Sequence, residues 1–190
     1  RESGMAIDEI SLPQTEQVGE VFGELMVAEL MAELSGVDVA EAMQTLDPVL
    51  RDRIAAAVRT GTDPESARAR VAQLARSVGE RMRGFTALLG PTVPFVARRE
   101  DSLADVGSAG EWNRAVGRNT RPGNVFGNCG ISLPIHRGHE LPVGLQLLGA
   151  AGDDVGLLSA ALAVESVVGR APQAELSDSR TVELHDRSNL

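Results

Sequence analysis

The hydrophobic pattern of the chain changes at Phe85, and this change constrains the fold more than any other sequence feature. Before Phe85, apolar residues recur at the spacing of three or four that is typical of amphipathic helices. After it, they fall in short runs separated by glycine, proline and polar residues, as in strands and turns. With 190 residues, the chain is long enough for one sizeable core. We therefore expect one compact unit with helices in its first part and strands in its second.

Helices are predicted in the first part over residues 15–34, 39–46, 49–60 and 65–84. Apolar residues recur at helical spacing in the first of them, and Glu16 lies in its first turn, where the helix dipole favours a carboxylate. The other helices begin with a capping signal. Asp38 is followed three residues later by Glu41, as in a capping box. Asp47 and Asp63 are each followed directly by proline, which is favoured as the first residue of a helix.

Strands are predicted from three short apolar runs, at 86–89, 131–135 and 143–148. The first strand is expected to be buried and to end at Gly90 and Pro91, after which the chain continues in an extended segment. The other two runs are joined by a polar turn that contains Gly138. This arrangement is typical of a β-hairpin of two buried strands.

The remaining stretches of the second part predict a loop and a helix. The polar, glycine-containing stretch 98–117 is expected to be a long surface loop, with at most one helical turn around Trp112. After the hairpin, Asp153 or Asp154 is expected to cap a helix that runs to Val168 and ends before a glycine. Apolar residues cover most of the circumference of this helix, so it is predicted to be buried.

All of this forms one predicted domain, residues 1–170, which is helical over 15–84 and holds the sheet and the buried helix over 85–170. The remaining residues, 171–190, are polar and show no hydrophobic pattern. They are expected to form a mobile tail.

Composition and charge exclude several classes of partner. The chain carries 18 basic and 27 acidic residues, a formal net charge of -9, without a basic stripe, so neither nucleic acid nor an anionic membrane is an expected partner. Its longest charge-free apolar stretch, near 155–164, is about half of the roughly 20 residues that a membrane-spanning helix needs. The single cysteine, Cys129, cannot form an internal disulfide, so the cytoplasm is the expected location.

Generic catalytic motifs are missing from the sequence. All 18 basic residues are arginine, so the chain cannot supply lysine-dependent chemistry. His136 and His139 lie beside Glu140, but a solvated turn is the preferred interpretation because a metal site needs further ligands on rigid elements. Cys129 is interpreted as a small packed residue, with a nucleophile as the alternative. No metal and no organic cofactor is expected.

A set of motifs in the second part has a recognisable order. Its most specific member is the block 141–146, which reads Leu-Pro-Val-Gly-Leu-Gln. Further matching residues are Thr120, Pro122, Asn124, Gly127, Ser132, Pro134, Leu157, Leu158 and Glu165. Together they resemble the C-terminal portion of the amidase-signature family. Residues 87–94 resemble that family's strand and proline-rich loop, and 22–34 its preceding helix, so the resemblance spans roughly residues 8–170.

The resemblance implies an α/β fold in which a few strands of a mixed sheet pack with helices, and of which this chain is the C-terminal part. In the family, the strands of that sheet come from both halves of the polypeptide. A C-terminal piece would therefore leave a sheet edge uncovered, and an uncovered edge attracts another strand. The expected partners are the missing N-terminal segment of the same enzyme or a second copy of the chain.

For activity, the resemblance implies that an amidase hydrolyses a carbon–nitrogen amide bond of a small molecule to a carboxylate and an amine or ammonia. Family members use a serine nucleophile, a second serine and a lysine, all from a glycine- and serine-rich segment in the N-terminal half. That segment and any lysine are missing from this sequence, so the chain alone is expected to be inactive. The alternative is a non-catalytic remnant or interaction module that keeps the scaffold and self-associates.

The resemblance also points to residues on the substrate side of the family's cleft: Thr120, Asn124 and Cys129. The loop that resembles residues 118–128 approaches that cleft in the family. A purely structural role is the alternative for each of them, since asparagine often holds backbone turns. Gln146, in a predicted buried strand, is interpreted in the same way as a residue that satisfies a polar neighbour.

Overall fold

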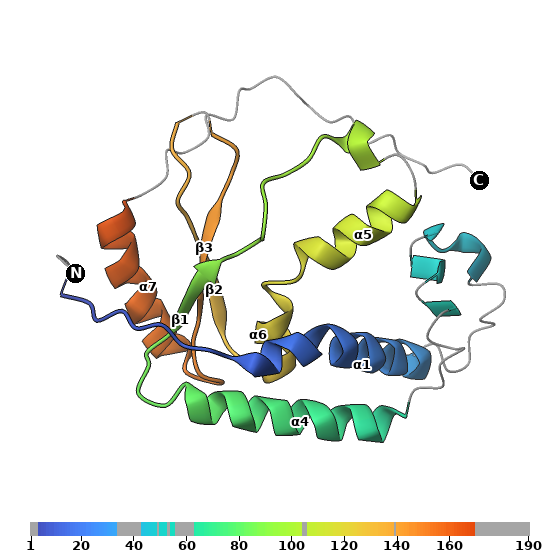
Figure 1. Cartoon of the computed structure of the whole chain (residues 1–190), viewed down its shortest axis with the longest axis horizontal. Coiled ribbons are helices and arrows are strands. Elements are labelled where there is room, and N and C mark those ends of the chain that lie inside the picture. Colours follow the sequence, from blue (N-terminus) through green and yellow to red (C-terminus); the bar gives the residue numbers. More distant parts are fainter. Residues whose placement is uncertain are drawn as a thin grey trace, which may run out of the picture.

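A small antiparallel sheet packed against helices forms the centre of the chain, as described by a computed structural model (Figure 1). The structure describes residues 4–33, 43–48, 50–52, 54–55, 63–103, 106–138 and 140–169. The predicted tail, 171–190, lies outside these residues. No helix in the described part has both the length and the hydropathy that spanning a bilayer requires.

The helical layer consists of α1 (Val18–Glu33), α4 (Pro64–Arg81) and the short α6 (Arg121–Phe126). A 3-10 turn, η1 (Pro13–Gln17), leads into α1. The sides of these helices that face one another bury a cluster formed by Val18, Val21, Leu74, Val78, Met82, Val125 and Phe126. The helices predicted over 15–34 and 65–84 are thus confirmed, with ends displaced by a few residues.

Aspartates begin two of the predicted helices, as expected. The Asp63 carboxylate accepts a hydrogen bond from the main-chain N–H of Glu65 at 3.1 Å. The carbonyl of Asp47 accepts one from the main-chain N–H of Arg51 at 2.9 Å, and the described residues from 50 to 55 are helical. Most of the predicted helix 39–46 lies outside the described residues.

The sheet contains three antiparallel strands in the order β1–β3–β2 (Figure 1). They are β1 (Leu88–Pro91), β2 (Gly130–Pro134) and β3 (Gly144–Leu148). In the register, Gly90 and Ser132 lie on either side of Gln146. Since β2 and β3 pair with one another, the predicted hairpin is confirmed. The expectation that both of its strands are buried is wrong for β2, in which only Leu133 is buried.

The structure of β1 differs from its prediction in two respects. Gly90 and Pro91 belong to the strand instead of ending it, and Leu89 is 45% exposed instead of buried. The main-chain N–H of Thr92 donates to the carbonyl of Gly144 at 2.9 Å. Because main-chain groups alternate in direction along an antiparallel strand, Pro91 faces away from β3. Proline at such an outward position removes no hydrogen bond of the ladder, so the strand can continue through it.

Helix α7 (Asp154–Val168) covers one face of the sheet. Its N-cap is Asp153, whose carboxylate accepts a hydrogen bond from the N–H of Gly156 at 3.2 Å. At the other end Gly169 has a φ of 80°, a conformation that favours glycine. The predicted limits of this helix are therefore confirmed. Its inner side packs on the sheet through Leu157, Ala161 and Val164.

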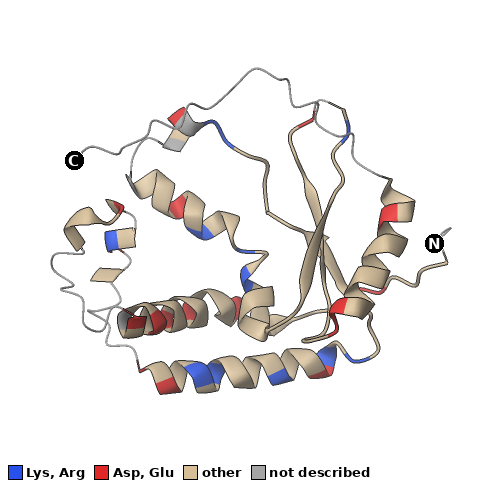
Figure 2. Cartoon of the chain, turned by 180° about the vertical axis from the view of Figure 1, so that it is seen from behind, with Lys and Arg blue, Asp and Glu red and all other residues tan. Residues whose placement is uncertain are grey.

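The prediction that α7 is buried all round is wrong. Val155, Leu158 and Leu162 are 78%, 55% and 67% exposed, respectively. Only Asp154 and Glu165 are charged within the helix, and Figure 2 shows little charge between its two ends. The sheet covers one side of α7, and no described part of the chain covers the other side.

A further helix, α5 (Val106–Val116), corrects the prediction of a loop over 98–117. The short 3-10 turn η2 (Glu100–Leu103) precedes it. Trp112 of α5 stacks on Phe95, with ring centroids 4.1 Å apart. Aromatic stacking of this kind contributes about 0.5–1.5 kcal/mol beyond the buried area. Part of the stability of α5 thus comes from a residue outside the stretch that forms it.

The C-terminal end of α5 is also held from outside. The guanidinium of Arg121 donates to the carbonyl of Arg114 at 2.5 Å and to that of Asn113 at 3.1 Å. These carbonyls belong to the last turn of the helix, where main-chain acceptors have no partner within the helix. The side chain of Arg121 therefore takes over the role of a helix cap.

Candidate functional site

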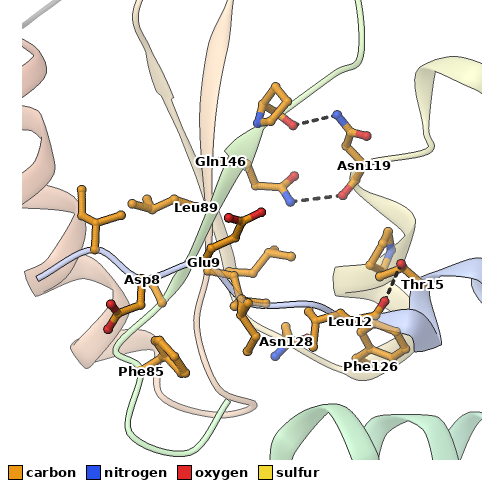
Figure 3. Close-up of a pocket in the computed structure, with 18 of the residues that line it drawn as sticks. Asp8, Glu9, Leu12, Thr15, Phe85, Leu89, Asn119, Phe126, Asn128 and Gln146 are labelled. Carbon is orange, nitrogen blue, oxygen red and sulfur yellow. Dashed lines mark hydrogen bonds between the residues drawn. The ribbon is translucent and has the colours of Figure 1, made fainter. Parts of the chain in front are cut away.

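A cavity of about 1020 Å³ lies beside β1 and forms the candidate functional site (Figure 3). Residues 6–12, which cross β1 in the figure, form one side of it. Pro122 and Phe126 of α6 form another side, and Gln146 of β3 also lines it. Its volume is at the upper end of the range of roughly 300–1,000 Å³ that is typical of small-molecule sites.

Two amide side chains connect the sheet to the start of α6 at this cavity (Figure 3). Gln146 is only 9% exposed, and its Nε2 donates to the main-chain carbonyl of Asn119 at 3.2 Å. In turn, Nδ2 of Asn119 donates to the carbonyl of Pro91 at 2.9 Å. Because Nε2 has a carbonyl partner, the orientation of the Gln146 amide is fixed. Its Oε1 accepts no hydrogen bond from the described residues and remains available as an acceptor.

Asn128 adds a second oriented amide to the lining. Its Nδ2 donates to the carbonyl of Gly149 at 2.7 Å, so a flipped amide would set two oxygens against each other. Its Oδ1 is buried and has no hydrogen-bond partner in the described part of the chain. An unpaired buried acceptor costs about 1–3 kcal/mol. Because this oxygen is closed off from solvent, a molecule in the cavity does not contact it directly, and Oε1 of Gln146 is the amide acceptor that the wall offers.

The charge around the cavity is mostly negative. Asp8, Glu9 and Glu16 line it with exposed side chains, whereas Arg118 is the one cation among the described lining residues. The hydroxyl of Thr15, which also lines the cavity, donates to the carbonyl of Leu12 at 2.7 Å. The lining therefore offers groups that bind and orient a molecule, favours neutral or cationic ligands over anions, and provides no activated nucleophile.

The three residues predicted for the substrate side lie on or next to α6, outside the lining of this cavity. Thr120 precedes α6 and its Oγ1 donates to the carbonyl of Gly117 at 3.3 Å. Asn124 is exposed on the helix, and Sγ of Cys129 donates to the carbonyl of Ala150 at 3.1 Å. Their contact with a substrate remains a prediction.

Sequence reasoning missed Asn119 and Asn128 as lining residues. Nothing in their spacing distinguishes them from other asparagines, since each gains its role from a carbonyl that is distant in sequence. Gln146 was considered only as a satisfied polar residue, and its hydrogen bond to Asn119 agrees with that interpretation. Its Oε1, which has no donor among the described residues, adds an acceptor to the lining that the pattern did not indicate.

Gly144, within the Leu-Pro-Val-Gly-Leu-Gln block, allows a close approach of two hydroxyl side chains. A Cβ atom at this position would lie 2.6 Å from Oγ1 of Thr92 and closer still to Oγ of Ser132. These two oxygens are hydrogen-bonded to each other at 2.5 Å. The block thus combines a glycine that the packing requires with the glutamine that lines the cavity.

For the turn between β2 and β3, the sequence favours a solvated turn over a metal site. The carboxylate of Glu140 accepts a hydrogen bond from the main-chain N–H of Arg137 at 3.0 Å, which closes the turn. His136 is half-buried, and His139 lies outside the described residues. No group of three potential metal ligands converges within the described residues.

Comparison with models of protein families gave no match. Individual relatives do match. The chain is 31% identical over 176 residues to 2-amino-5-chloromuconic acid deaminase of Comamonas testosteroni, a match that covers 89% of this chain and 37% of that protein. It is 38% identical over 88 residues to mandelamide hydrolase of Pseudomonas putida, which covers 45% of this chain and 17% of that protein.

Among solved structures, a crystal structure of an amidase matches with a TM-score of 0.71 and 27% sequence identity. That match covers 85% of this chain and 37% of the amidase. The chain therefore spans little more than a third of the deaminase and of the amidase. The relatives and the shared fold agree with the order of the sequence motifs. The expected resemblance to amidases is thus confirmed over most of this chain.

Proposed function

We propose that this chain is the C-terminal portion of an amidase. Such an enzyme hydrolyses a carbon–nitrogen amide bond to a carboxylate and an amine or ammonia. The observation that carries this proposal is the match to an amidase structure over 85% of the chain. The name of mandelamide hydrolase supports the same class of reaction, and the name of the deaminase indicates a reaction that also breaks a carbon–nitrogen bond.

The reacting groups of the enzyme come from outside this chain. The sequence contains no lysine, and the family resemblance assigns the two serines and the lysine to an N-terminal segment. This chain supplies the scaffold and part of the pocket wall. Oε1 of Gln146, held by its hydrogen bond to Asn119, is placed to accept an N–H from a small amide. Thr120, Asn124 and Cys129 are proposed as further substrate-side residues.

A chimera tests the proposal directly. In the deaminase of Comamonas testosteroni, the matched region is replaced by this chain, and turnover of 2-amino-5-chloromuconic acid and of mandelamide is measured. We expect hydrolysis of at least one of them by the chimera and none by the isolated chain. A chimera that is folded by circular dichroism but hydrolyses neither compound would overturn the proposal.

Two glycine substitutions serve as a matched pair in that chimera. Gly144→Ala forces a Cβ against Thr92 and Ser132, whereas a Cβ on Gly90 meets no atom within 4 Å. We expect Gly144→Ala to destabilise the chimera by about 1–3 kcal/mol and to lower its activity, because the hydroxyl pair has to move. Gly90→Ala should leave both nearly unchanged. Equal effects of the two substitutions would show that the close approach at Gly144 is unimportant.

A second candidate function is a non-catalytic module that self-associates. The uncovered apolar side of α7, with Val155, Leu158 and Leu162, favours it. Light scattering coupled to size-exclusion chromatography separates the two candidates. A monodisperse dimer of the isolated chain, together with an inactive chimera, would favour the module over the enzyme portion.

A further inference from the structure

We propose that the cavity beside β1 binds a small amide that also carries an ammonium group, such as the primary amide of an amino acid. The carboxamide N–H binds Oε1 of Gln146, and the ammonium group lies beside Glu9. This inference rests on the proposed function and deepens it, because it names the class of amide that the enzyme takes. Three features of the lining carry it: an oriented acceptor, a carboxylate and apolar side chains.

The oriented acceptor is Oε1 of Gln146. This residue is 9% exposed, and its Nε2 donates to the carbonyl of Asn119, which fixes the side of the amide on which Oε1 lies. Unlike Oδ1 of Asn128, Oε1 is not closed off from solvent, so a molecule in the cavity can reach it. A carboxamide N–H satisfies this oxygen. A carboxylate cannot, because it has no hydrogen to donate.

Glu9 supplies the carboxylate. In Figure 3 its side chain points to the side on which Gln146 lies, whereas Asp8 points the other way, as successive side chains of an extended segment do. Glu9 is exposed and forms no ion pair with a described residue. Its charge is therefore available to an ammonium group of a ligand.

The position of Arg118 orients the ligand between these two groups. Arg118 lines the cavity and directly precedes Asn119, so it lies on the Gln146 side. A cation there attracts the carbonyl oxygen of the carboxamide and repels the ammonium group. The ammonium group therefore takes the side of Glu9. The acid formed by hydrolysis of such an amide leaves Oε1 of Gln146 without a donor, so it binds more weakly than the amide.

Apolar side chains form much of the remaining wall. Phe85 and Leu89 are 38% and 45% exposed, and both line the cavity. Further apolar lining residues are Ile7, Leu88, Phe126 and Leu148. A mostly apolar wall with a few placed polar groups is typical of small-molecule sites. We therefore expect the ligand to carry an apolar or aromatic body.

Three ligands of similar shape test the two polar contacts separately in the chain itself. Phenylalaninamide carries the ammonium group and the carboxamide, 3-phenylpropanamide lacks the ammonium group, and phenylalanine has a carboxylate in place of the carboxamide. Dissociation constants are measured by NMR titration at about pH 6, where the α-amino group is protonated. We expect phenylalaninamide to bind about 2–5-fold more tightly than 3-phenylpropanamide. It should bind about 10-fold or more tightly than phenylalanine, and its addition should shift the side-chain amide signals of Gln146.

Two neighbouring substitutions form a matched pair. Glu9→Gln and Asp8→Asn each remove one exposed carboxylate from the same segment. Glu9→Gln should make the dissociation constants of phenylalaninamide and 3-phenylpropanamide nearly equal, whereas Asp8→Asn should keep most of the preference. Gln146→Leu should remove the preference for phenylalaninamide over phenylalanine. The ligand series needs no substitution, so it tests the proposal even if Gln146→Leu does not fold.

Equal dissociation constants of the three ligands, or NMR shifts confined to residues outside the cavity, overturn the proposal. Equal effects of Glu9→Gln and Asp8→Asn overturn the place assigned to the ammonium group. A chain that distinguishes the ligands as expected, together with an inactive deaminase chimera, retains the binding site and removes the proposed function. An active chimera together with a chain that does not distinguish the ligands retains the function and removes the site.

Discussion

Helices α4 and α7 begin in the same way but present opposite outer surfaces. Each starts at an aspartate whose carboxylate accepts a main-chain N–H, and each buries an apolar stripe. On its outer side α4 exposes charged residues such as Arg68 and Arg76, whereas α7 exposes Leu158 and Leu162 (Figure 2). The buried stripe explains why each helix forms. The outer side tells whether the surface around the helix is complete.

By this criterion the outer side of the helical layer is suited to contact with water, whereas the apolar outer side of α7 is suited to contact with another surface. A charged outer side is stable in water. A row of large apolar side chains is not, because its removal from water by another surface lowers the free energy of the system. Within the described residues, the chain therefore combines a helical layer with a charged outer side and a helix whose outer side is apolar and exposed. Four experiments test this comparison.

The largest expected effect separates the two sides of α7. Leu157 is buried against the sheet and Leu158 is exposed on the opposite side. We expect Leu157→Ala to lower the free energy of unfolding by about 2–5 kcal/mol, because it removes apolar contacts and leaves a cavity. Leu158→Ala should cost about 0.5 kcal/mol or less. Urea denaturation measures both, and similar losses would mean that the outer side is covered as well.

Removal of the N-caps comes next. Asp63→Ala in α4 and Asp153→Ala in α7 should each lower the free energy of unfolding by about 1 kcal/mol, since each leaves a main-chain N–H without its acceptor. Thermal unfolding of each variant, with the matching Asp→Asn variant as control, measures the loss. If only one of the two substitutions lowers the free energy of unfolding, the N-caps of α4 and α7 do not contribute equally, and the similarity of the two helix starts is contradicted.

A smaller effect is expected at the ion pair between α1 and α4. Nη1 of Arg70 lies 2.9 Å from Oε2 of Glu24, and Nη2 lies 3.4 Å from Oε1 of Glu20. All three side chains are partly exposed, so Arg70→Gln should cost only about 0.2–1 kcal/mol. The loss should shrink in high salt, which screens such pairs. A salt-independent loss would point to packing of the arginine stem instead.

The smallest effect on stability is expected on the outer side of α7. The pair Leu158→Gln and Leu162→Gln should change the free energy of unfolding by about 0.5 kcal/mol or less. It should nevertheless reduce self-association in concentrated solution, measured by light scattering, because it breaks the apolar row. Arg68→Gln with Arg76→Gln on α4 is the control. Equal self-association of the parent and the α7 variant would show that the apolar outer side of α7 does not mediate association, and the proposed difference from α4 would be wrong.

Elements whose signals lie within their own sequence could be predicted. The aspartate caps of α4 and α7 act on main-chain groups two or three residues away, so the sequence contains both partners. The same holds for the β2–β3 hairpin, because a short polar turn joins two apolar runs. Helix α5 could not be predicted, since Phe95 and Arg121 stabilise it from outside. The exposure of the outer side of α7 depends on what covers it, which periodicity does not encode.

The candidate site shows the same limit. The resemblance to the amidase-signature family follows from motifs that keep their order along the chain. The lining of the cavity does not, because Gln146, Asn119 and Pro91 meet through hydrogen bonds across 27 and 28 residues. Such contacts follow from strand order and register. The substrate-side role of Thr120, Asn124 and Cys129 follows from the family resemblance alone, and none of the three lines the cavity.

The stacking of α5 gives the chain a built-in optical reporter. Trp112 is its only tryptophan, and the sequence contains no tyrosine. Its ring contacts Phe95 and lies 4.9 Å from the guanidinium carbon of Arg98, so nearly all intrinsic emission arises where α5 meets the segment before it. Circular dichroism sums over every helix. If the emission changes at lower denaturant than the dichroism, α5 detaches first, and if both change together, the chain unfolds as one unit.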